Sequence, residues 1–334
     1  MSEARNHPGQ LVSDGSGPPL ADQLPVTAAA WSQAHAAAAG AAVRLAEVDN
    51  LAALSAVQEL FDRIWRPASR PPIGLELLRA LRKAGNYVGG AYDGERLVGA
   101  CVGFFSAPAD SALHSHIAGV APGLTGRRVG YALKLHQRAW ALSHVTSAIE
   151  WTFDPLVARN AYFNLVKLAG QPTEYLTNFY GGMHDGINGD DDTDRLLVHW
   201  ELTAPAVTAA CSGHWQLTDA ESLRRRGAVV GLARDEDGGP RPGRIGRSAV
   251  TLLAVPPDIE TLRLRDPGRA RQWRLAIRET LAGLLAEGGR IRGFDRAGWY
   301  VVEPAGSDGL TPRDRDLATA DTGRESTDDE AARR

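Results

Sequence analysis

Hydrophobic and polar positions follow two different periods in the first third of the chain. Residues 42–48 alternate between apolar and polar side chains, which predicts a half-buried strand. Residues 51–65 and about 74–84 instead repeat their apolar side chains at helical spacing and predict two amphipathic helices. Residues 87–105 contain two apolar runs around the tight-turn pair Asp93-Gly94, so they predict a β-hairpin.

The same reasoning extends the pattern to residue 202. We expect helices at about 127–144 and 157–169, and strands at 113–120, 147–153, 174–180 and 195–202. The predicted order is strand, two helices, three strands, helix, strand, helix, two strands. This order predicts a mixed α/β fold (α+β, mixed sheet) with helices on both faces of the sheet.

The remaining segments differ from this region in composition. We expect a disordered leader at 1–40, a domain at 41–204, an extension at 213–304 that packs on that domain, and a disordered tail at 305–334. The Pro/Ala/Thr-containing stretch 203–212 marks the boundary, and 216–247 is polar and rich in Arg and Gly. Within the extension the pattern predicts a small strand–helix–hairpin unit, with a strand at 249–255, a helix at about 268–287 and strands at 290–295 and 298–303.

Composition narrows the class of protein. The chain has 334 residues, of which 43% are apolar, and its 37 basic and 40 acidic side chains give a net charge of -3. These values argue against a collagen, a coiled coil and a general nucleic-acid binder, and two cysteines are too few for a disulfide scaffold. The sequence shows neither a signal peptide nor a membrane-spanning run, so we expect a cytoplasmic protein with no membrane partner. A homodimer stays open.

A glycine-containing loop between a predicted strand and a predicted helix carries the strongest chemical signal. It runs from Val120 through Gly126, Arg127 and Arg128 to Gly130. Backbone N–H groups at a helix start, together with the helix dipole, form a site for a phosphate or pyrophosphate. Glycines let such a ligand approach closely, and arginines add charge. The alternative is a plain strand–turn–helix link whose glycines only serve the turn.

This loop resembles the acyl-CoA signature of the GNAT superfamily of N-acyltransferases, Arg/Gln-x-x-Gly-x-Gly/Ala after a strand and before a helix. Arg127-Arg128-Val129-Gly130-Tyr131-Ala132 fits the signature, and Val120-Ala121-Pro122 resembles the strand end before it. The order of elements from 42 to 202 is similar to the GNAT fold, and Asn160 and Gly170 repeat the plan of the family's next helix. Runs such as Trp151-Thr152-Phe153-Asp154-Pro155 resemble a little-characterised bacterial group of predicted GNAT proteins with a C-terminal extension.

The resemblance implies how an acyl-CoA would bind. Its pyrophosphate would lie on the amides of Arg127 to Ala132, and its pantetheine arm would lie beside strand 113–120 where neighbouring strands splay. It implies acetyl-CoA or another acyl-CoA as co-substrate, with no metal. The residues it points to for cofactor binding are Val120, Arg127, Arg128, Val129, Gly130, Tyr131, Ala132 and Asn160. An amine would attack the thioester directly, with a base, an oxyanion-stabilising N–H and an acid for the leaving thiolate supplied by the enzyme.

Three side chains are candidates for the base. His114 and His116 lie two residues apart and therefore face the same side of their strand, and a histidine titrates near neutrality. Glu150 points away from its apolar neighbours on the next strand. The alternatives are a hydrogen-bonded histidine at the core or rim and a carboxylate in an exposed salt bridge, and we carry His116 and Glu150 forward as catalytic candidates.

The acid departs from the family's pattern. Relatives often carry a Tyr about seven residues after the Asn, but Lys167 stands there in this chain. Tyr162 is the candidate acid, with packing as its alternative role, and Asn164 and Lys167 are the other polar candidates in the same helix.

Two charged regions invite other interpretations. The run from Asp185 to Asp194 could form a solvated turn, an acceptor site for an amine or a cation site, although it lacks the EF-hand order. Residues 221–300 hold 16 arginines against 10 acids, with Arg224-Arg225-Arg226 the densest group. They could be solvated, or bind the adenosine 3′-phosphate, an acidic substrate or nucleic acid; no aromatic-interleaved pattern supports nucleic acid, and we expect no nucleic-acid partner.

The sequence therefore favours an acyl-CoA-dependent N-acyltransferase that transfers an acetyl or succinyl group to a primary amine of a small molecule or amino acid. A non-catalytic acyl-CoA-binding sensor or scaffold and a protein-directed acetyltransferase are the alternatives.

Overall fold

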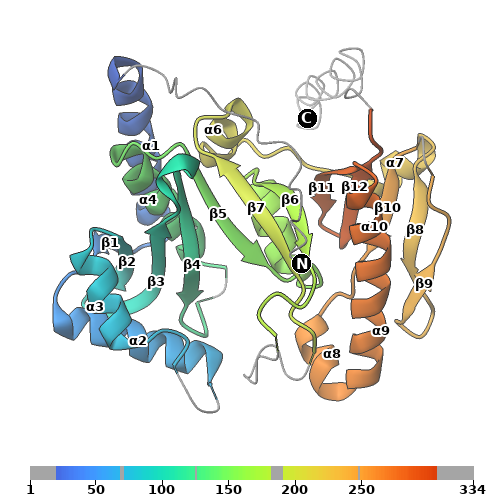
Figure 1. The fold of residues 1–334 in the computed structure, drawn as a ribbon, viewed down its shortest axis with the longest axis horizontal. Helices are drawn as coiled ribbons and strands as arrows, with labels where there is room; N and C mark the ends of the chain where they lie inside the picture. The colour runs from blue at the N-terminus through green and yellow to red at the C-terminus, as the bar shows by residue number, and fades with distance from the viewer. Residues whose placement is uncertain (1–19, 68–70, 125, 182–190, 247–248, 307–334) are drawn as a thin grey trace, which may run out of the picture.

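The computed structural model of the chain describes residues 20–67, 71–124, 126–181, 191–246 and 249–306. They form two sheets that lie side by side, with helices around each (Figure 1). Among the helices of these ranges, none is both long enough and apolar enough to cross a membrane.

The first sheet has seven strands in the order β1-β2-β3-β4-β5-β7-β6. Every neighbouring pair is antiparallel except β4 and β5, which are parallel. The bounds are β1 Arg44–Glu47, β2 Tyr87–Asp93, β3 Arg96–Phe105, β4 Ala112–Val120, β5 Ala148–Phe153, β6 Gln171–Leu176 and β7 Arg195–Glu201. The predicted strand order along the chain and the mixed α/β fold are confirmed.

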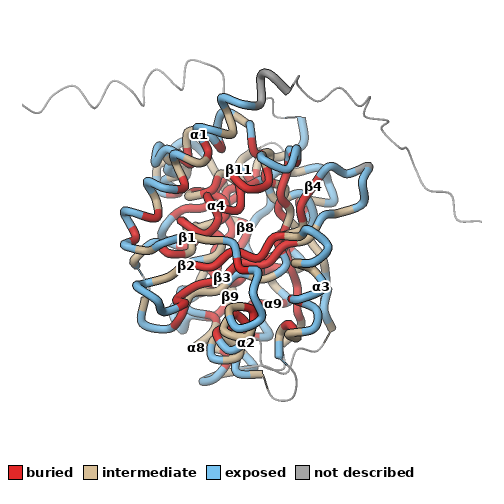
Figure 2. Tube along the Cα trace, turned by 90° about the vertical axis from the view of Figure 1, so that its left-hand side faces the viewer, coloured by how far each residue is buried: buried red, intermediate tan, exposed pale blue. Residues whose placement is uncertain are grey.

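Helices cover both faces of this sheet. On one face lies α4 (Val129–Ser143), which is mostly buried (Figure 2). On the other lie α2 (Leu51–Trp65) and α3 (Leu75–Lys83), whose apolar sides pack against residues of β2 and β3. The Asn50 side chain begins α2 by accepting a hydrogen bond from the Ala53 N–H at 2.8 Å, a typical N-cap. A short 3₁₀ turn, Pro108–Asp110, precedes β4, and α6 (Pro205–Cys211) follows the sheet.

The expectation of a disordered leader through residue 40 is wrong for residues 20–40, which form helix α1 (Leu20–Gly40). Its buried side chains are alanines, such as Ala30 and Ala34, which allow α1 to lie close against α4. The Trp31 indole N–H donates to Ser143 Oγ at the end of α4, at 3.0 Å. Tertiary packing therefore stabilises a helix whose own apolar face is thin. Residues 1–19 and the tail from 307 lie outside the described residues.

The C-terminal extension is larger than the predicted strand–helix–hairpin unit. It forms a five-stranded sheet of its own, in the order β11-β12-β10-β8-β9. The strands are β8 Val229–Arg234, β9 Pro240–Pro242, β10 Thr251–Ala254, β11 Arg290–Asp295 and β12 Trp299–Glu303. The helices are α7 Ala220–Arg225, α8 Ile259–Arg265, α9 Pro267–Ile277 and α10 Gly283–Ala286, with a π-helical turn η3 Arg278–Ala282 between the last two.

The two sheets share one hydrophobic core. A single apolar cluster contains Trp151 of β5 and Phe294 and Tyr300 of the second sheet. The Tyr300 hydroxyl donates to the Pro155 carbonyl at 2.8 Å, and β11 contacts β6. The second sheet is thus packed directly against the elements that follow β5.

Candidate functional site

Strands β4 and β5 separate soon after they begin. They pair at only three positions, Ala112 with Ala148, Leu113 with Ile149 and His114 with Glu150. Beyond these, β4 continues to Val120 and β5 to Phe153 without pairing to each other, and the two strands diverge (Figure 1). We call the point after His114 and Glu150 the apex. An unpaired strand edge presents backbone N–H and C=O groups that can hydrogen-bond an extended ligand.

A β-bulge lies beside the apex. Val102 of β3 is opposite Ile117 and Gly103 is opposite Ser115, so His116 is the extra residue on β4. Bulges redirect side chains and backbone groups, and they are frequent next to active sites. His116 is exposed, as expected for a side chain that the bulge turns out of the regular ladder.

Three polar side chains line up across neighbouring strands at the apex. His114 of β4 is level with Glu150 of β5, which is level with His199 of β7. Glu150 Oε1 lies 2.9 Å from His199 Nδ1, and the Glu150 side chain is 32% exposed. The structure therefore brings the predicted Glu150 and His114 to one face of the sheet, and the ring of the predicted His116 lies 6.0 Å from that of His114. His199 was not predicted, although it alternates with buried neighbours in its strand.

The two histidines of β4 are less basic than free histidine. Burial lowers the pKa of His114, and the neighbouring His116 lowers it further. His116 is exposed as a residue, but its imidazole is partly desolvated where it packs on Phe104, and this lowers its pKa. Their rings pack on the Phe104 ring, with centroids 5.0 and 5.7 Å away. Both imidazoles are therefore neutral at pH 7 and can accept a proton.

The first turn of α4 presents open backbone amides. Its N-cap, Arg128, has a φ of 61° and supplies no side-chain cap. A Cβ added to Gly130 would meet only Val120 Cγ2, at 3.7 Å, so packing within the chain does not require a glycine there. The Ala132 N–H already donates to the Arg128 carbonyl, so the missing side chain leaves room above the amides of Val129 to Tyr131, which suits an anionic ligand.

The structure gives Arg127 and Tyr131 positioning roles within this region. The Arg127 guanidinium donates to Asp93 at 2.8 Å and to the carbonyls of Ala41 and Ala42. Its N–H donates to the Leu124 carbonyl, so both the side chain and the backbone of Arg127 stabilise the loop. The Tyr131 hydroxyl donates to the Ala210 carbonyl at 2.8 Å, and burial raises its pKa to about 12.

The helix after β5 changes its geometry midway. It begins as α5 (Ala158–Tyr162), which contains Asn160, and continues as the π-helical turn η2 (Phe163–Lys167). Tyr162 is half-buried and packs against the core. Lys167 Nζ lies 2.9 Å from the centroid of the Trp215 ring and 5.6 Å from that of Tyr162. Burial lowers the pKa of Lys167, and the charges of Arg128 and Arg296 lower it further.

The charges of two arginines act on Lys167 from different elements. Arg128 comes from the N-cap of α4, Lys167 from η2, and Arg296 from the turn between β11 and β12. Like charges destabilise one another unless an anion lies between them. The arrangement suits a phosphate-bearing ligand.

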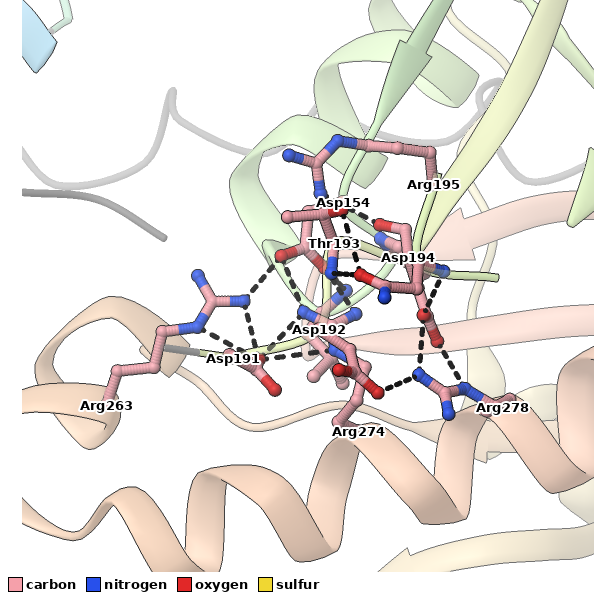
Figure 3. Close-up of polar contacts among 12 residues, drawn as sticks. Asp154, Asp191, Asp192, Thr193, Asp194, Arg195, Arg263, Arg274 and Arg278 are labelled. Carbon is pink, nitrogen blue, oxygen red and sulfur yellow. Dashed lines mark hydrogen bonds and ion pairs between the residues drawn. The ribbon is translucent and has the colours of Figure 1, made fainter. Parts of the chain in front are cut away.

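The aspartates that are described in the Asp-rich run are engaged by arginines. Arg274 donates to Asp154 and Asp191 at 2.8 and 3.0 Å, and Arg263 reaches the same pair (Figure 3). Burial alone would raise the pKa of Asp154, but the adjacent guanidinium of Arg274 lowers it overall.

The same arrangement continues one turn along, where Arg278 pairs with Asp192 and Asp194, each at 2.7 Å. These carboxylates tie the second sheet's helices to the first sheet and are not available to an amine. No cluster of metal-binding side chains occurs among the described residues, and Asp185, Asn188 and Asp190 lie outside them. Of the densest arginine group, Arg224 pairs with Glu221, and all three are exposed.

The strand order, the splayed parallel pair and the helix that follows β4 define the class of fold. Together they agree with the fold that the resemblance of the loop motif to the GNAT superfamily implied, and residues 44–201 carry this arrangement. The second sheet is an addition to it.

Comparisons with solved structures find similarity to acetyltransferases over about half of this chain. The ribosomal-protein-S18-alanine N-acetyltransferase from Escherichia coli has 9% identity and a TM-score of 0.39, covering 48% of this chain and 95% of its own. Aminoglycoside 6′-acetyltransferase type Ii has 14% identity and a TM-score of 0.38, covering 48% and 98%. A Salmonella typhimurium protein solved with its cofactor acetyl-CoA has 13% identity and a TM-score of 0.39, covering 49% and 96%. No family model matches the chain, and no curated protein matches its sequence.

Proposed function

We propose that this chain is an acyl-CoA-dependent N-acyltransferase that transfers an acetyl or succinyl group to a primary amine of a small molecule or amino acid. The observation that carries the proposal is a continuous row of backbone groups that an acyl-CoA could contact. It begins at the uncapped amides of α4, follows the unpaired edge of β4 from Val120 to Ser115, and ends at the apex beside Glu150.

The amides of Val129 to Tyr131 would hold the pyrophosphate, supported by the helix dipole and by Arg128, Lys167 and Arg296. The unpaired backbone of β4 would hold the pantetheine arm by strand-like hydrogen bonds. The unpaired edge extends over about five residues, or roughly 16 Å at 3.3 Å per residue. The chain of CoA from phosphate to sulfur equals about four to five extended residues, roughly 15 Å, so the thioester would reach the apex.

At the apex, Glu150 would take the proton from the attacking amine. His199 holds the Glu150 carboxylate in place through the 2.9 Å hydrogen bond, and His114 lies level with it on β4. The neutral His116 is a second acceptor for the same proton, directly or through a water molecule. The amine enters unprotonated, and its nitrogen attacks the thioester carbonyl as this proton is transferred.

Substitution of Gly130 by Asp tests the binding site. A carboxylate there would occupy the space above the amides and repel the pyrophosphate, while an acidic side chain in the first turn favours the helix itself. We expect loss of CoA binding by calorimetry with unchanged thermal stability. Gly283→Asp is the matched control, because Gly283 is also helical and a Cβ there would meet nothing within 4 Å. Unchanged CoA affinity in Gly130→Asp would overturn the site.

The activity itself is tested with pooled primary amines and acetyl-CoA or succinyl-CoA, read by thiol release and mass spectrometry. A new amide product supports transfer and identifies the acceptor. CoA binding without any transfer, to small amines or to peptides, would instead indicate a non-catalytic sensor or scaffold. Transfer to peptides alone would indicate a protein-directed enzyme.

A further inference from the structure

A buried lysine lies under the apex, on the face of the sheet opposite Glu150. Lys134 of α4 is one of only three lysines in the chain, and 5% of it is exposed. Its Nζ donates to Ser115 Oγ at 3.2 Å and to Gln137 Oε1 at 2.7 Å. It also lies 4.0 Å from the centroid of the Trp151 ring. The ammonium is thus held in one position by three neighbours from three elements.

Two of these neighbours mark the point where the strands part. His114 and Glu150 form the last pair between β4 and β5. Ser115 directly follows His114, and Trp151 directly follows Glu150. Because side chains alternate along a strand, Ser115 and Trp151 face α4 whereas Glu150 faces away from it. The Lys134 ammonium and the Glu150 carboxylate therefore lie on opposite sides of the same apex.

The charge of Lys134 has no counterion within the described structure. Its two hydrogen-bond acceptors are neutral, and none of the ion pairs among the described residues includes it. Gln137 turns its oxygen to the ammonium although this leaves its Nε2, also buried, without a hydrogen-bond partner there. The titratable groups that face Lys134 are the Cys101 thiol on β3 and His114. A buried cation with neutral neighbours is costly, and it suits a site where negative charge develops during a reaction.

We propose that Lys134 is the general acid that protonates the sulfur of CoA as the acyl group leaves. This role rests on the proposed function. It accounts for the absence of a tyrosine at position 167, because an acid is supplied from α4 instead of from the helix after β5. It also assigns the two proton transfers to the two faces of the sheet.

The step balances in atoms and charge. The amine nitrogen forms a bond to the carbonyl carbon, and the carbon–sulfur bond breaks with its electron pair going to sulfur. The Lys134 ammonium gives a proton to that sulfur and becomes a neutral amine, while Glu150 receives a proton from the attacking nitrogen. Solvent then returns a proton to Lys134 and takes one from Glu150, which restores both groups.

The acidity of Lys134 suits this task. Burial lowers its pKa to about 8, and a cysteine-like thiol has a pKa of roughly 8.5. A general acid is most effective when its pKa lies near that of its partner and near the working pH. Since only the protonated form donates, we expect the turnover rate to fall as the pH rises above about 8.

The experiment follows the thiol of bound CoA and needs no acceptor amine. The thiolate absorbance of CoA bound to the full chain is titrated with pH in the wild type and in Lys134→Met. An ammonium beside the sulfur favours the thiolate, so the bound thiol should titrate about one to three pH units lower in the wild type. Lys83→Met, which changes an exposed lysine, is the matched control and should titrate as the wild type does.

A second variant separates charge from proton donation and remains informative if Lys134→Met does not fold. Lys134→Arg keeps a cation that does not give up its proton, so the bound thiol should stay acidic while turnover falls about 100-fold or more and its decline above pH 8 disappears. Equal titration of the bound thiol in the wild type and Lys134→Met, or full turnover in Lys134→Arg, overturns the role of Lys134 alone. A wild type that does not bind CoA overturns the proposed function itself.

Discussion

Glu150 shows how the position of one residue assigns its chemistry. It occupies the last position at which β5 pairs with β4, so it lies beside both His114 and the start of the unpaired strand edge. Its carboxylate is partly exposed and is held by His199. Partial exposure lets a substrate amine contact the Glu150 carboxylate, and the hydrogen bond to His199 fixes its orientation. A side chain that only stabilised the sheet would need neither property.

Replacing Glu150 by Gln should leave CoA binding unchanged and lower kcat about 100-fold or more, because an amide cannot accept the proton of the amine. The measurement is steady-state thiol release with the acceptor found in the amine screen. Glu201→Gln is the matched control. Glu201 lies on the same face of β7 as His199, and its Oε2 is 3.9 Å from His199 Nε2. Unaltered turnover in Glu150→Gln would move the base to His116, which His116→Ala would then test.

At the scale of elements, helices α8 and α9 are joined to the first sheet by buried charge. Arg263 and Arg274 converge on Asp154, which directly follows β5, and on Asp191 (Figure 3). Both guanidiniums and both carboxylates are almost fully buried, so each charge depends on the others for compensation.

Arg274→Met should therefore destabilise the protein by about 3–5 kcal/mol, because it leaves the buried Asp154 and Asp191 short of positive charge. Urea unfolding at neutral pH measures the change. Arg271→Met lies one turn earlier on α9 with an exposed side chain and should change stability by less than about 0.5 kcal/mol. Equal effects of the two variants would contradict the role given to the cluster.

The elements that the sequence predicted are those whose signal is local. The Asp93-Gly94 turn fixes the β2–β3 hairpin, and the apolar spacing of Leu54, Val57 and Phe61 fixes α2. In contrast, α1 is held by contacts with α4, and β8 pairs in parallel with β10, about twenty residues later in the chain. The pairing of Glu150 with His199 is also long-range, so it cannot be predicted from amino-acid type or from spacing along the chain. The loop before α4 was predictable because its sequence and its geometry are both local.

At the scale of the whole molecule, the second sheet takes part in the candidate site as well as in the core. Arg296 stands in the turn between β11 and β12, and its charge acts on Lys167 beside the start of α4. The extension would then contribute a cation to the phosphate end of the donor site.

Arg296→Glu should weaken CoA binding about five-fold at low ionic strength, and the effect should shrink as salt is added, because an exposed charge is screened. Calorimetry at two salt concentrations measures both. Arg290→Glu, at the opposite end of β11 and also exposed, is the control. An equal loss of affinity in the control would show that only net charge matters.

Helix α4 carries both Gly130, at the phosphate end of the row of backbone groups, and Lys134, under the apex. The two residues are four apart on one helix, which fixes their separation at about 6 Å of rise and their relative direction to within about 40°. One residue inserted between them would turn Lys134 by about 100° away from Ser115 while leaving the first turn intact. Such a protein should still bind CoA yet fail to release it as a thiol. The spacing along α4 therefore sets the distance between the phosphate-binding amides and the ammonium that protonates the sulfur.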